Sequence, residues 1–291
     1  MARRSTAWTV ALLATSVLFG AYGCASDLHV PSSVNAGQGF SISTEGSGDA
    51  TFYLLGPGNV IKRPVTLGAV ISITSDDVAS AGQYQAIICS SQGCAAATFQ
   101  VRAGDPARIS FSLHPSRVPV STPDAIDATA FVFDRYYNPV LQTTKVEFQI
   151  SSGAGADTTR TIPVQRGVAW MRIGSSNKAG PVRIVASVAD IREPRVIQQV
   201  AAEACSLRMK ATPNAKGALL ETDPVRDCSG NPLPDGTIVS FTKTDTTGKT
   251  TVDAPIKKGV ARAQVELKGH SQISVACGVV LGNEISVAGK T

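Results

Sequence analysis

The stretch that decides the fold occurs twice, as DRYYNPV at residues 134–140 and as DCSGNPL at residues 227–233. The two copies lie 93 residues apart. The Asp in such a turn accepts hydrogen bonds from nearby backbone N–H groups, a Gly or Asn supplies positive φ, and the Pro sets the exit into the next strand. Because Tyr137 stands where the other copy has Gly230, we expect the first turn to be strained or differently shaped. A turn repeated at this spacing predicts two copies of one domain.

The repeat continues beyond the turn. Three further landmarks recur in the same order, at offsets of 91 to 93 residues: a Val-x-Phe strand (146–148 and 239–241), a Gly-Val-Ala step (167–169 and 259–261) and an alternating apolar strand (182–186 and 273–277). Short alternating runs of Val, Ile, Thr and Phe, separated by turn-forming residues, extend over the whole chain after residue 27. This pattern is typical of antiparallel β-sandwiches. We predict an all-β protein of tandem Ig-like antiparallel sandwiches, with domains at 27–103, 104–201 and 202–291.

These landmarks resemble the bacterial Ig-like domains of the invasin and intimin type, which share the strand ending in Asp, the Gly-Asn-Pro-Val turn and the final Gly-x-Ala-x-Val-x-Ala strand. The resemblance covers residues 104–291. It implies sandwiches that act as stalks, spacers or adhesive modules at a cell surface, and it identifies no ligand. The first domain is Ig-like in a more general sense, because Tyr84 stands where the tyrosine of a tyrosine corner would.

The first 23 residues have the layout of a secretory signal. Two arginines precede an uncharged stretch from Trp8 to Gly23, which is short for a bilayer span. The stretch ends as AYGC at residues 21–24, which resembles the lipobox of bacterial lipoproteins. We expect lipidation of Cys24 and hence an exported protein, held at the outer membrane or cell surface by its N-terminal lipid. Cleavage by an ordinary signal peptidase is the alternative.

The composition argues against several classes of function. Charged residues make up 17% and aromatic residues 5% of the chain, and the three histidines are far apart in sequence. The net charge is +5 with no Lys/Arg run longer than two residues, so we expect no nucleic-acid partner. We predict no catalytic residue, no cofactor and no metal site. The Ser-x-x-Lys sequence at 175–178 falls in a loop between strands, where the chemistry of penicillin-recognising enzymes lacks its helix, and Asp76 and Asp77 are expected to form a turn rather than a calcium site.

Six cysteines in an exported chain indicate disulfides. Cys89 and Cys94 flank a short turn between two strand-like runs, so we predict that they pair. Cys205, Cys228 and Cys277 lie in the third domain, where any two of them could meet at one pole of a sandwich. The pattern leaves that choice open, and Cys277 also fits a buried thiol on a core-facing strand position.

Trp170 is the one tryptophan after the signal. It lies on an alternating strand, where we expect it to face the core; an outward orientation would make it the first candidate for contact with a partner. The function predicted is a non-enzymatic envelope lipoprotein whose domains form a stalk or an adhesive, presenting module, with an unidentified protein or surface glycan as its partner. The alternatives are a secreted or periplasmic subunit of an envelope assembly and a carbohydrate-binding accessory protein. The low aromatic content speaks against the last of these.

Overall fold

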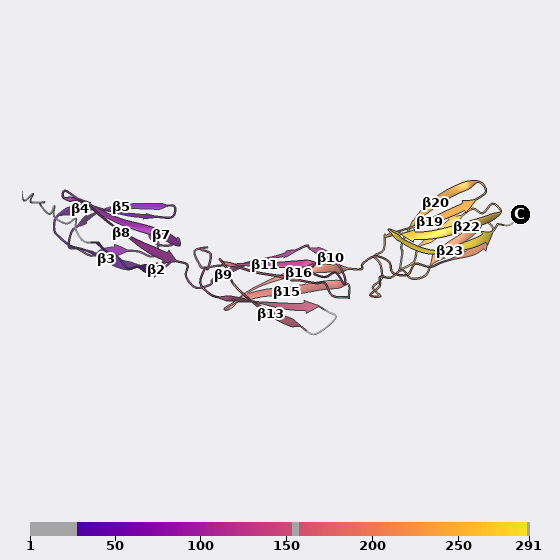
Figure 1. Ribbon diagram of the computed structural model, residues 1–291, viewed down its shortest axis with the longest axis horizontal. Coiled ribbons are helices and arrows are strands. Elements are labelled where there is room, and N and C mark those ends of the chain that lie inside the picture. The colour runs from indigo at the N-terminus through magenta and orange to yellow at the C-terminus, as the bar shows by residue number, and fades with distance from the viewer. Residues whose placement is uncertain (1–27, 153–156, 290–291) are drawn as a thin grey trace, which may run out of the picture. The chain divides into compact units, whose positions relative to one another are not determined.

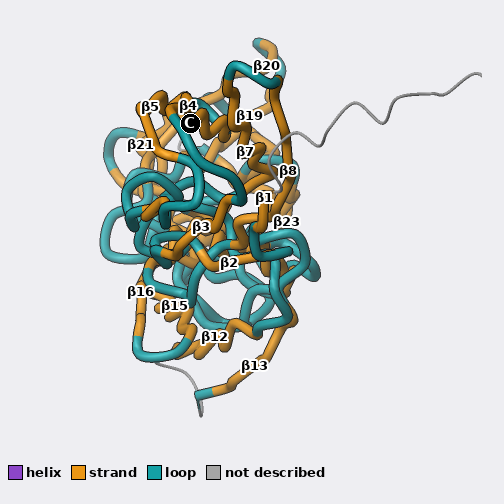
Figure 2. The backbone as a smooth tube through the Cα atoms, turned by 90° about the vertical axis from the view of Figure 1, so that its left-hand side faces the viewer, coloured by secondary structure: helices purple, strands orange, loops and turns teal. Residues whose placement is uncertain are grey.

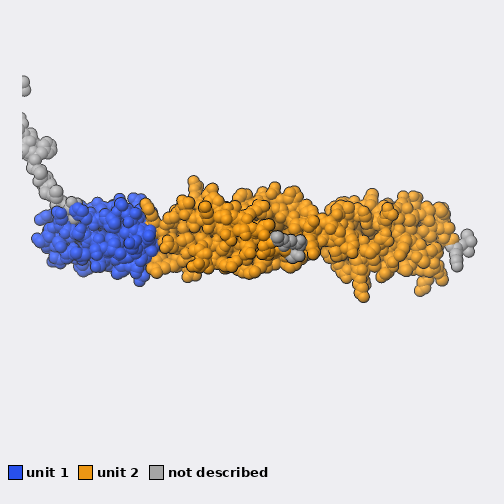
Figure 3. All heavy atoms as spheres, turned by 90° about the horizontal axis from the view of Figure 1, so that it is seen from below, with its two compact units in different colours: residues 1–101 blue, residues 102–291 orange. Residues whose placement is uncertain are grey.

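The computed structural model describes residues 28–152 and 157–289, and these consist of strands, turns and loops without a helix (Figures 1 and 2). Accordingly, no helix in the described part of the chain is long and apolar enough to cross a membrane. The signal segment and Cys24 lie outside the described residues. The chain divides into two compact units, residues 1–101 and 102–291 (Figure 3).

The first unit contains two sheets, with strand orders β1-β3-β6 and β2-β8-β7-β4-β5. Its strands are β1 (Leu28–His29), β2 (Ser33–Asn35), β3 (Phe40–Thr44), β4 (Asp49–Gly56), β5 (Asn59–Thr66), β6 (Ile71–Ile73), β7 (Gly82–Ser90) and β8 (Gly93–Arg102). The pairings β1–β3, β3–β6, β4–β5, β4–β7 and β7–β8 are antiparallel. On each strand, apolar side chains alternate with polar ones and face inward, so that one face of the strand is removed from water.

Tyr84 organises the core of this unit. It is 2% exposed, its ring stacks on Phe99 with centroids 5.4 Å apart, and its hydroxyl donates to the carbonyl oxygen of Ser80 at 3.0 Å. That bond to a backbone group four residues upstream is the tyrosine corner that the sequence suggests. Gly56 packs against the ring so closely that a Cβ there would lie 2.1 Å from a ring carbon. Only glycine fits at that position.

The second unit contains four sheets, and each sheet takes its strands from one segment of the chain. Residues 108–200, which we call the second sandwich, form the sheets β14-β11-β9 and β10-β16-β15-β12-β13. The strands are β9 (Arg108–His114), β10 (Arg117–Pro119), β11 (Ile126–Phe133), β12 (Lys145–Ser152), β13 (Thr158–Pro163), β14 (Val168–Ile173), β15 (Gly180–Val188) and β16 (Ile191–Val200). The short β10 runs parallel to β16, whereas β11 with β14 and β9, β12 with β13 and β15, and β15 with β16 pair antiparallel.

Residues 209–288, which we call the third sandwich, form the sheets β17-β18-β21 and β20-β19-β22-β23. The strands are β17 (Met209–Asn214), β18 (Gly217–Thr222), β19 (Ile238–Asp245), β20 (Gly248–Pro255), β21 (Arg262–Val265), β22 (His270–Cys277) and β23 (Val280–Ala288). Its buried apolar side chains form one core cluster together with those of residues 201–208, which we call the linker. Seven strands in two sheets are the architecture of a constant-type Ig sandwich.

The sequence repeat occupies equivalent positions in the two sandwiches. Phe148 on β12 and Phe241 on β19 are both fully buried, and the alternating apolar strands are β15 and β22. The Gly-Val-Ala steps have the same backbone shape, since Gly167 and Gly259 both have φ of 83°. The predicted fold class, all-β with tandem Ig-like sandwiches, is confirmed.

Candidate functional site

The Asp of each repeated turn is nearly inaccessible and accepts a dense set of hydrogen bonds. Asp134 is 1% and Asp227 is 4% exposed. In the first copy, the backbone N–H groups of Tyr136 and Asn138 donate to Asp134 at 2.8 and 2.9 Å, and the Asn138 amide donates at 2.8 Å. In the second copy, the equivalent donors are the N–H groups of Ser229 and Asn231 and the Asn231 amide, at 2.9, 2.8 and 3.0 Å. The two turns are therefore built by the same chemistry.

Each Asp also holds the segment that leads into its own sandwich. The N–H of Gly104 donates to Asp134 at 2.9 Å, and the N–H of Ala202 donates to Asp227 at 3.0 Å. Burial would raise the pKa of both carboxyl groups, but their hydrogen bonds outweigh it and hold each pKa below its ordinary value. Both carboxylates are therefore ionised at neutral pH. Asp134 fixes residues 102–107, the linker before the second sandwich, and Asp227 fixes the linker before the third.

In the second copy the turn also contacts the preceding sandwich. The Asn231 amide donates to the carbonyl oxygen of Asn177 at 2.9 Å, and the N–H of Ala179 donates to Asn231 Oδ1 at 2.8 Å. Beside them, the hydroxyls of Ser121 and Ser229 lie 2.9 Å apart. One turn of the third sandwich thus bonds both the linker and the loop between β14 and β15.

The Ser-x-x-Lys sequence at residues 175–178 lies in this loop between β14 and β15. The Ser175 hydroxyl donates to the carbonyl oxygen of Pro119 at 2.7 Å, and both the N–H and the hydroxyl of Ser176 donate to Gln199, at 3.0 and 2.7 Å. These hydroxyls therefore shape the loop that Asn231 contacts.

The structure joins Cys89 to Cys94 and Cys205 to Cys228, and it leaves Cys277 free and buried. The Cys205–Cys228 bridge, with Cα atoms 4.7 Å apart, crosslinks the linker to the Asp227 turn. The N–H of Cys205 also donates to the carbonyl oxygen of Arg226 at 2.9 Å. Burial raises the pKa of the Cys277 thiol, so the protonated, unreactive form is favoured.

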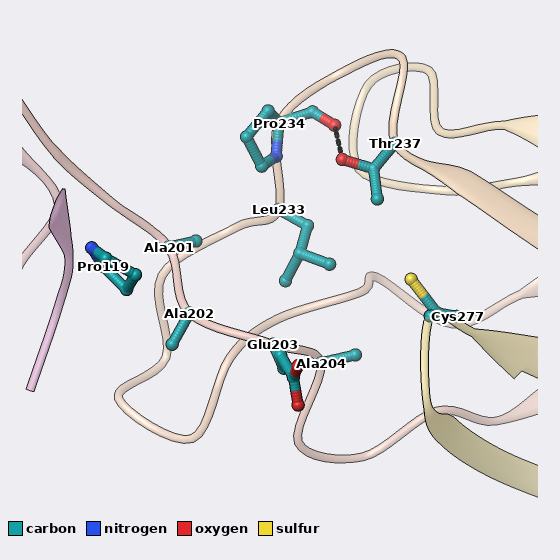
Figure 4. Close-up of a pocket in the computed structure, with 10 residues that line it drawn as sticks. Pro119, Ala201, Ala202, Glu203, Ala204, Leu233, Pro234, Thr237 and Cys277 are labelled. Carbon is teal, nitrogen blue, oxygen red and sulfur yellow. Dashed lines mark hydrogen bonds between the residues drawn. The ribbon is translucent and has the colours of Figure 1, made fainter. Parts of the chain in front are cut away.

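A pocket of about 400 Å³ lies beside the linker (Figure 4). Its walls are mostly small or apolar; they include Pro119 from β10, Ala201 and Ala204 from the linker, and Leu233 and Cys277 from the third sandwich. Figure 4 shows the Leu233 side chain and the Cys277 thiol directed toward this space. Glu203 is its one ionisable lining residue besides the thiol. The pocket offers no set of groups suited to catalysis.

The expectation that Trp170 faces the core is wrong. Trp170 is 52% exposed, whereas Ala169 and Met171 on the same strand are buried. The Arg172 guanidinium lies 5.5 Å from the indole ring centre and pairs with Asp127 at 2.7 Å. The repeat contained the missing signal: Arg262 of β21 stands where Trp170 stands in β14, and a charged residue there indicates the solvent-facing side.

The Asp76–Asp77 pair forms a turn. Asp77 receives a two-pronged ion pair from Arg63 at 2.6 and 2.7 Å and the N–H of Thr74 at 2.8 Å. Burial opposes ionisation here, but these bonds lower the pKa of Asp77 overall. Within the described residues, no cluster of three or more His, Cys, Asp or Glu side chains is arranged to hold a metal ion.

No protein-family profile matches the chain, and no curated protein matches its sequence. Among solved structures, the Escherichia coli adhesin FdeC matches with a TM-score of 0.61 at 15% identity, over 91% of this chain and 96% of that chain. The chain has the fold of invasin-type Ig-like repeat proteins.

Two further matches share this fold. Invasin, described as a bacterial integrin-binding protein, matches with a TM-score of 0.50 at 12% identity, over 91% of this chain and 60% of that chain. Yersinia pseudotuberculosis InvD matches with a TM-score of 0.51 at 8% identity, over 90% and 97%. The predicted resemblance to invasin and intimin domains is confirmed for the fold.

Proposed function

We propose that this protein is a non-enzymatic lipoprotein of the cell envelope, whose tandem Ig-like domains act as a stalk or an adhesive, presenting module at the surface. The observation that supports it best is the Asp227 turn. Its carboxylate holds the linker at Ala202, and its neighbour Asn231 bonds the loop of the preceding sandwich. Bonds of this kind resist bending between two domains, which a spacer or presenting module requires.

Two features support export and anchoring. Disulfides persist in oxidising compartments, and the described residues contain two of them. The AYGC sequence at residues 21–24 provides the cysteine that a lipid would modify. Mass spectrometry of the mature N-terminus tests this part. A diacyl or triacyl group on Cys24 is the expected result, and an unmodified terminus at Cys24 or Ser26 would contradict it.

An adhesive role is supported by the matches in fold, because FdeC is described as an adhesin and invasin as an integrin-binding protein. Beads coated with the purified chain, compared with beads coated with albumin, test adhesion to cultured host cells. Adhesion above the albumin background is expected. Adhesion at the albumin background on every cell line tested would contradict the adhesive role but not the stalk role.

A further inference from the structure

The solvent-facing side of the sheet β14-β11-β9 gathers aromatic side chains in a chain that is poor in them. Among the described residues, the large aromatic side chains that are most exposed are Phe131 at 40%, Trp170 at 52% and Tyr137 at 64%. Phe131 and Trp170 lie on β11 and β14, and Tyr137 lies in the turn that follows β11. With Val168, Arg108 and Arg172, these residues are called the aromatic face below.

The strand register places these side chains in adjacent rows. Trp170 is opposite Thr129, which is opposite Ser112; the next row aligns Val168, Phe131 and Ser110. Strands lie about 4.8 Å apart and successive same-face residues about 6.8 Å apart, so the outward rows from Asp127 to Phe133 extend over about 20 Å. The aromatic face is therefore a continuous platform with a row of hydroxyl side chains beside it.

Arginines stand at both ends of this platform. At one end, Arg172 lies over Trp170 and pairs with Asp127. At the other, the Arg108 guanidinium lies 4.5 Å from the centre of the Tyr137 ring, and no carboxylate of the described residues lies within ion-pair distance of it. The three strands contain two Arg, one Asp and one His, with no Lys or Glu. The excess of positive charge on the face therefore lies at the Arg108 end, because Asp127 offsets Arg172.

We propose that the aromatic face binds an acidic linear polysaccharide, an inference that rests on the proposed adhesive function and names its ligand class. The C–H face of a sugar ring stacks on Trp170 and Phe131. The hydroxyl groups of the sugar form hydrogen bonds with the side-chain hydroxyls of Ser110, Ser112 and Thr129. Carboxylates of the glycan pair with Arg108, since guanidinium matches carboxylate geometry and Arg172 already pairs with Asp127. Hydroxyl side chains beside exposed aromatic rings match the hydroxyl groups and C–H faces of sugar rings, which favours a glycan over a protein partner.

Trp170 provides a reporter for the test. In the chain from Cys24 onward it is the one tryptophan, so its fluorescence reports on this face alone. The probe is polygalacturonate, and its methyl ester is the uncharged counterpart with the same backbone. We expect polygalacturonate to shift or quench the emission saturably, and the ester to bind at least about tenfold more weakly. No spectral change with polygalacturonate, hyaluronan or alginate would overturn the proposal, and equal binding of the ester would overturn its acidic specificity.

Variants locate the site by calorimetry, which needs no tryptophan. Trp170→Ala should weaken polygalacturonate binding at least about tenfold, the loss expected of one stacking contact, and Arg108→Gln should remove the preference over the ester. Val196→Ala is the matched control, because Val196 is 60% exposed on β16 of the opposite sheet of the same sandwich. Binding unchanged in Trp170→Ala, or equally lost in Val196→Ala, would contradict the assignment.

Bead adhesion separates this inference from the proposed function. If beads adhere to cells and Trp170→Ala adheres equally well, the aromatic face is not the ligand site and the adhesive function stands. If adhesion needs Trp170 but survives periodate oxidation of the cell-surface glycans, the partner is a protein and the glycan inference is wrong. A dimer in solution that Trp170→Ala dissociates would assign the face to a second copy of this chain, which also overturns the inference.

Discussion

The turns at 134–140 and 227–233 share one hydrogen-bonding arrangement. In both, a buried Asp accepts two backbone N–H groups of its own turn, one Asn amide and one N–H of the incoming linker. The second copy adds the Cys205–Cys228 disulfide and the contacts of Asn231 with the preceding loop. What is common to both turns holds a linker to its sandwich, and what is added in the second joins one sandwich to the next.

The two turns also differ in the residue that adopts positive φ. The residue before the Asn has positive φ in both, 66° at Tyr137 and 84° at Gly230. Glycine adopts this conformation without strain, whereas a side chain costs about 1 to 2 kcal/mol there. Tyr137 keeps the turn shape, as its N–H donates to the carbonyl oxygen of Asp134 just as Gly230 donates to Asp227. The two turns therefore have nearly the same shape. The strain expected in the first turn is present as the positive φ of Tyr137.

The largest expected effect follows from removing the carboxylate. Asp227→Ala leaves the N–H groups of Ala202 and Ser229 and the Asn231 amide without their acceptor, and each buried unsatisfied donor costs about 1 to 3 kcal/mol. We expect the third sandwich to lose about 4 kcal/mol of its free energy of unfolding. Urea denaturation measures this loss. Asp235→Ala, at an exposed position of the following loop, is the control, and an equal effect of both variants would contradict the role of Asp227.

The next effect concerns the crosslink that the first copy lacks. Replacing both Cys205 and Cys228 by Ser opens a loop of 23 residues' separation and should cost about 3 kcal/mol. Cys277→Ser is the control for loss of a thiol alone. A loss no larger than that of the control would mean that the backbone bonds hold the linker without the disulfide.

The crosslink can also be transferred to the first copy. Ala107 and Arg135 occupy the positions of Cys205 and Cys228, since the N–H of Ala107 donates to Phe133 as Cys205 donates to Arg226. The variant with cysteines at both positions should form a disulfide and gain about 2 kcal/mol over its reduced form. Thiol titration and urea denaturation with and without reductant test this, and two more free thiols than in the wild type would show that the two linkers run differently.

A smaller effect is expected at the residue with positive φ. A Cβ on Gly230 meets no atom within 4 Å, so Gly230→Ala adds backbone strain without a clash. It should cost about 1 kcal/mol. In Tyr137→Gly, relief of strain is opposed by loss of the Arg108 contact worth about 0.5 to 1 kcal/mol, so the net change should be smaller. Thermal unfolding of both variants gives the comparison, and a larger effect at Tyr137 would contradict it.

The smallest effect is the acid dependence that both turns share. Burial raises the pKa of Asp134 and Asp227, but their hydrogen bonds lower it further, and the net pKa is depressed. Such a group stabilises the fold above its unfolded-state pKa of about 3.9, and this contribution is lost as the pH falls through the folded-state value. Stability should thus fall below about pH 4. In urea denaturation, Asp134→Asn and Asp227→Asn should make this loss of stability at low pH less steep, by similar amounts. A steeper loss in either variant would mean that the folded-state pKa of that Asp is raised rather than lowered.

Much of this arrangement follows from local sequence, and the rest depends on contacts that no local pattern encodes. The strands, the repeat and the Cys89–Cys94 hairpin follow from alternation, turn residues and short spacing. The choice of Cys228 as the partner of Cys205 depends on where the linker meets the turn. The position of Asn231 on the 177–179 loop depends on how two sandwiches meet. The expected inward orientation of Trp170 is wrong because alternation alone does not decide which set of alternate residues faces the core; comparison with Arg262 decides it.

Through Asn231, the Asp227 turn joins the second and third sandwiches into one body. Residual dipolar couplings of backbone amides in the full exported chain test it most directly, with residues 108–200 and 209–288 fitted separately. We expect one shared alignment tensor in the wild type and two different tensors in Asn231→Ala, with each sandwich still folded. Two different tensors in the wild type, or a shared tensor that survives Asn231→Ala, would contradict it.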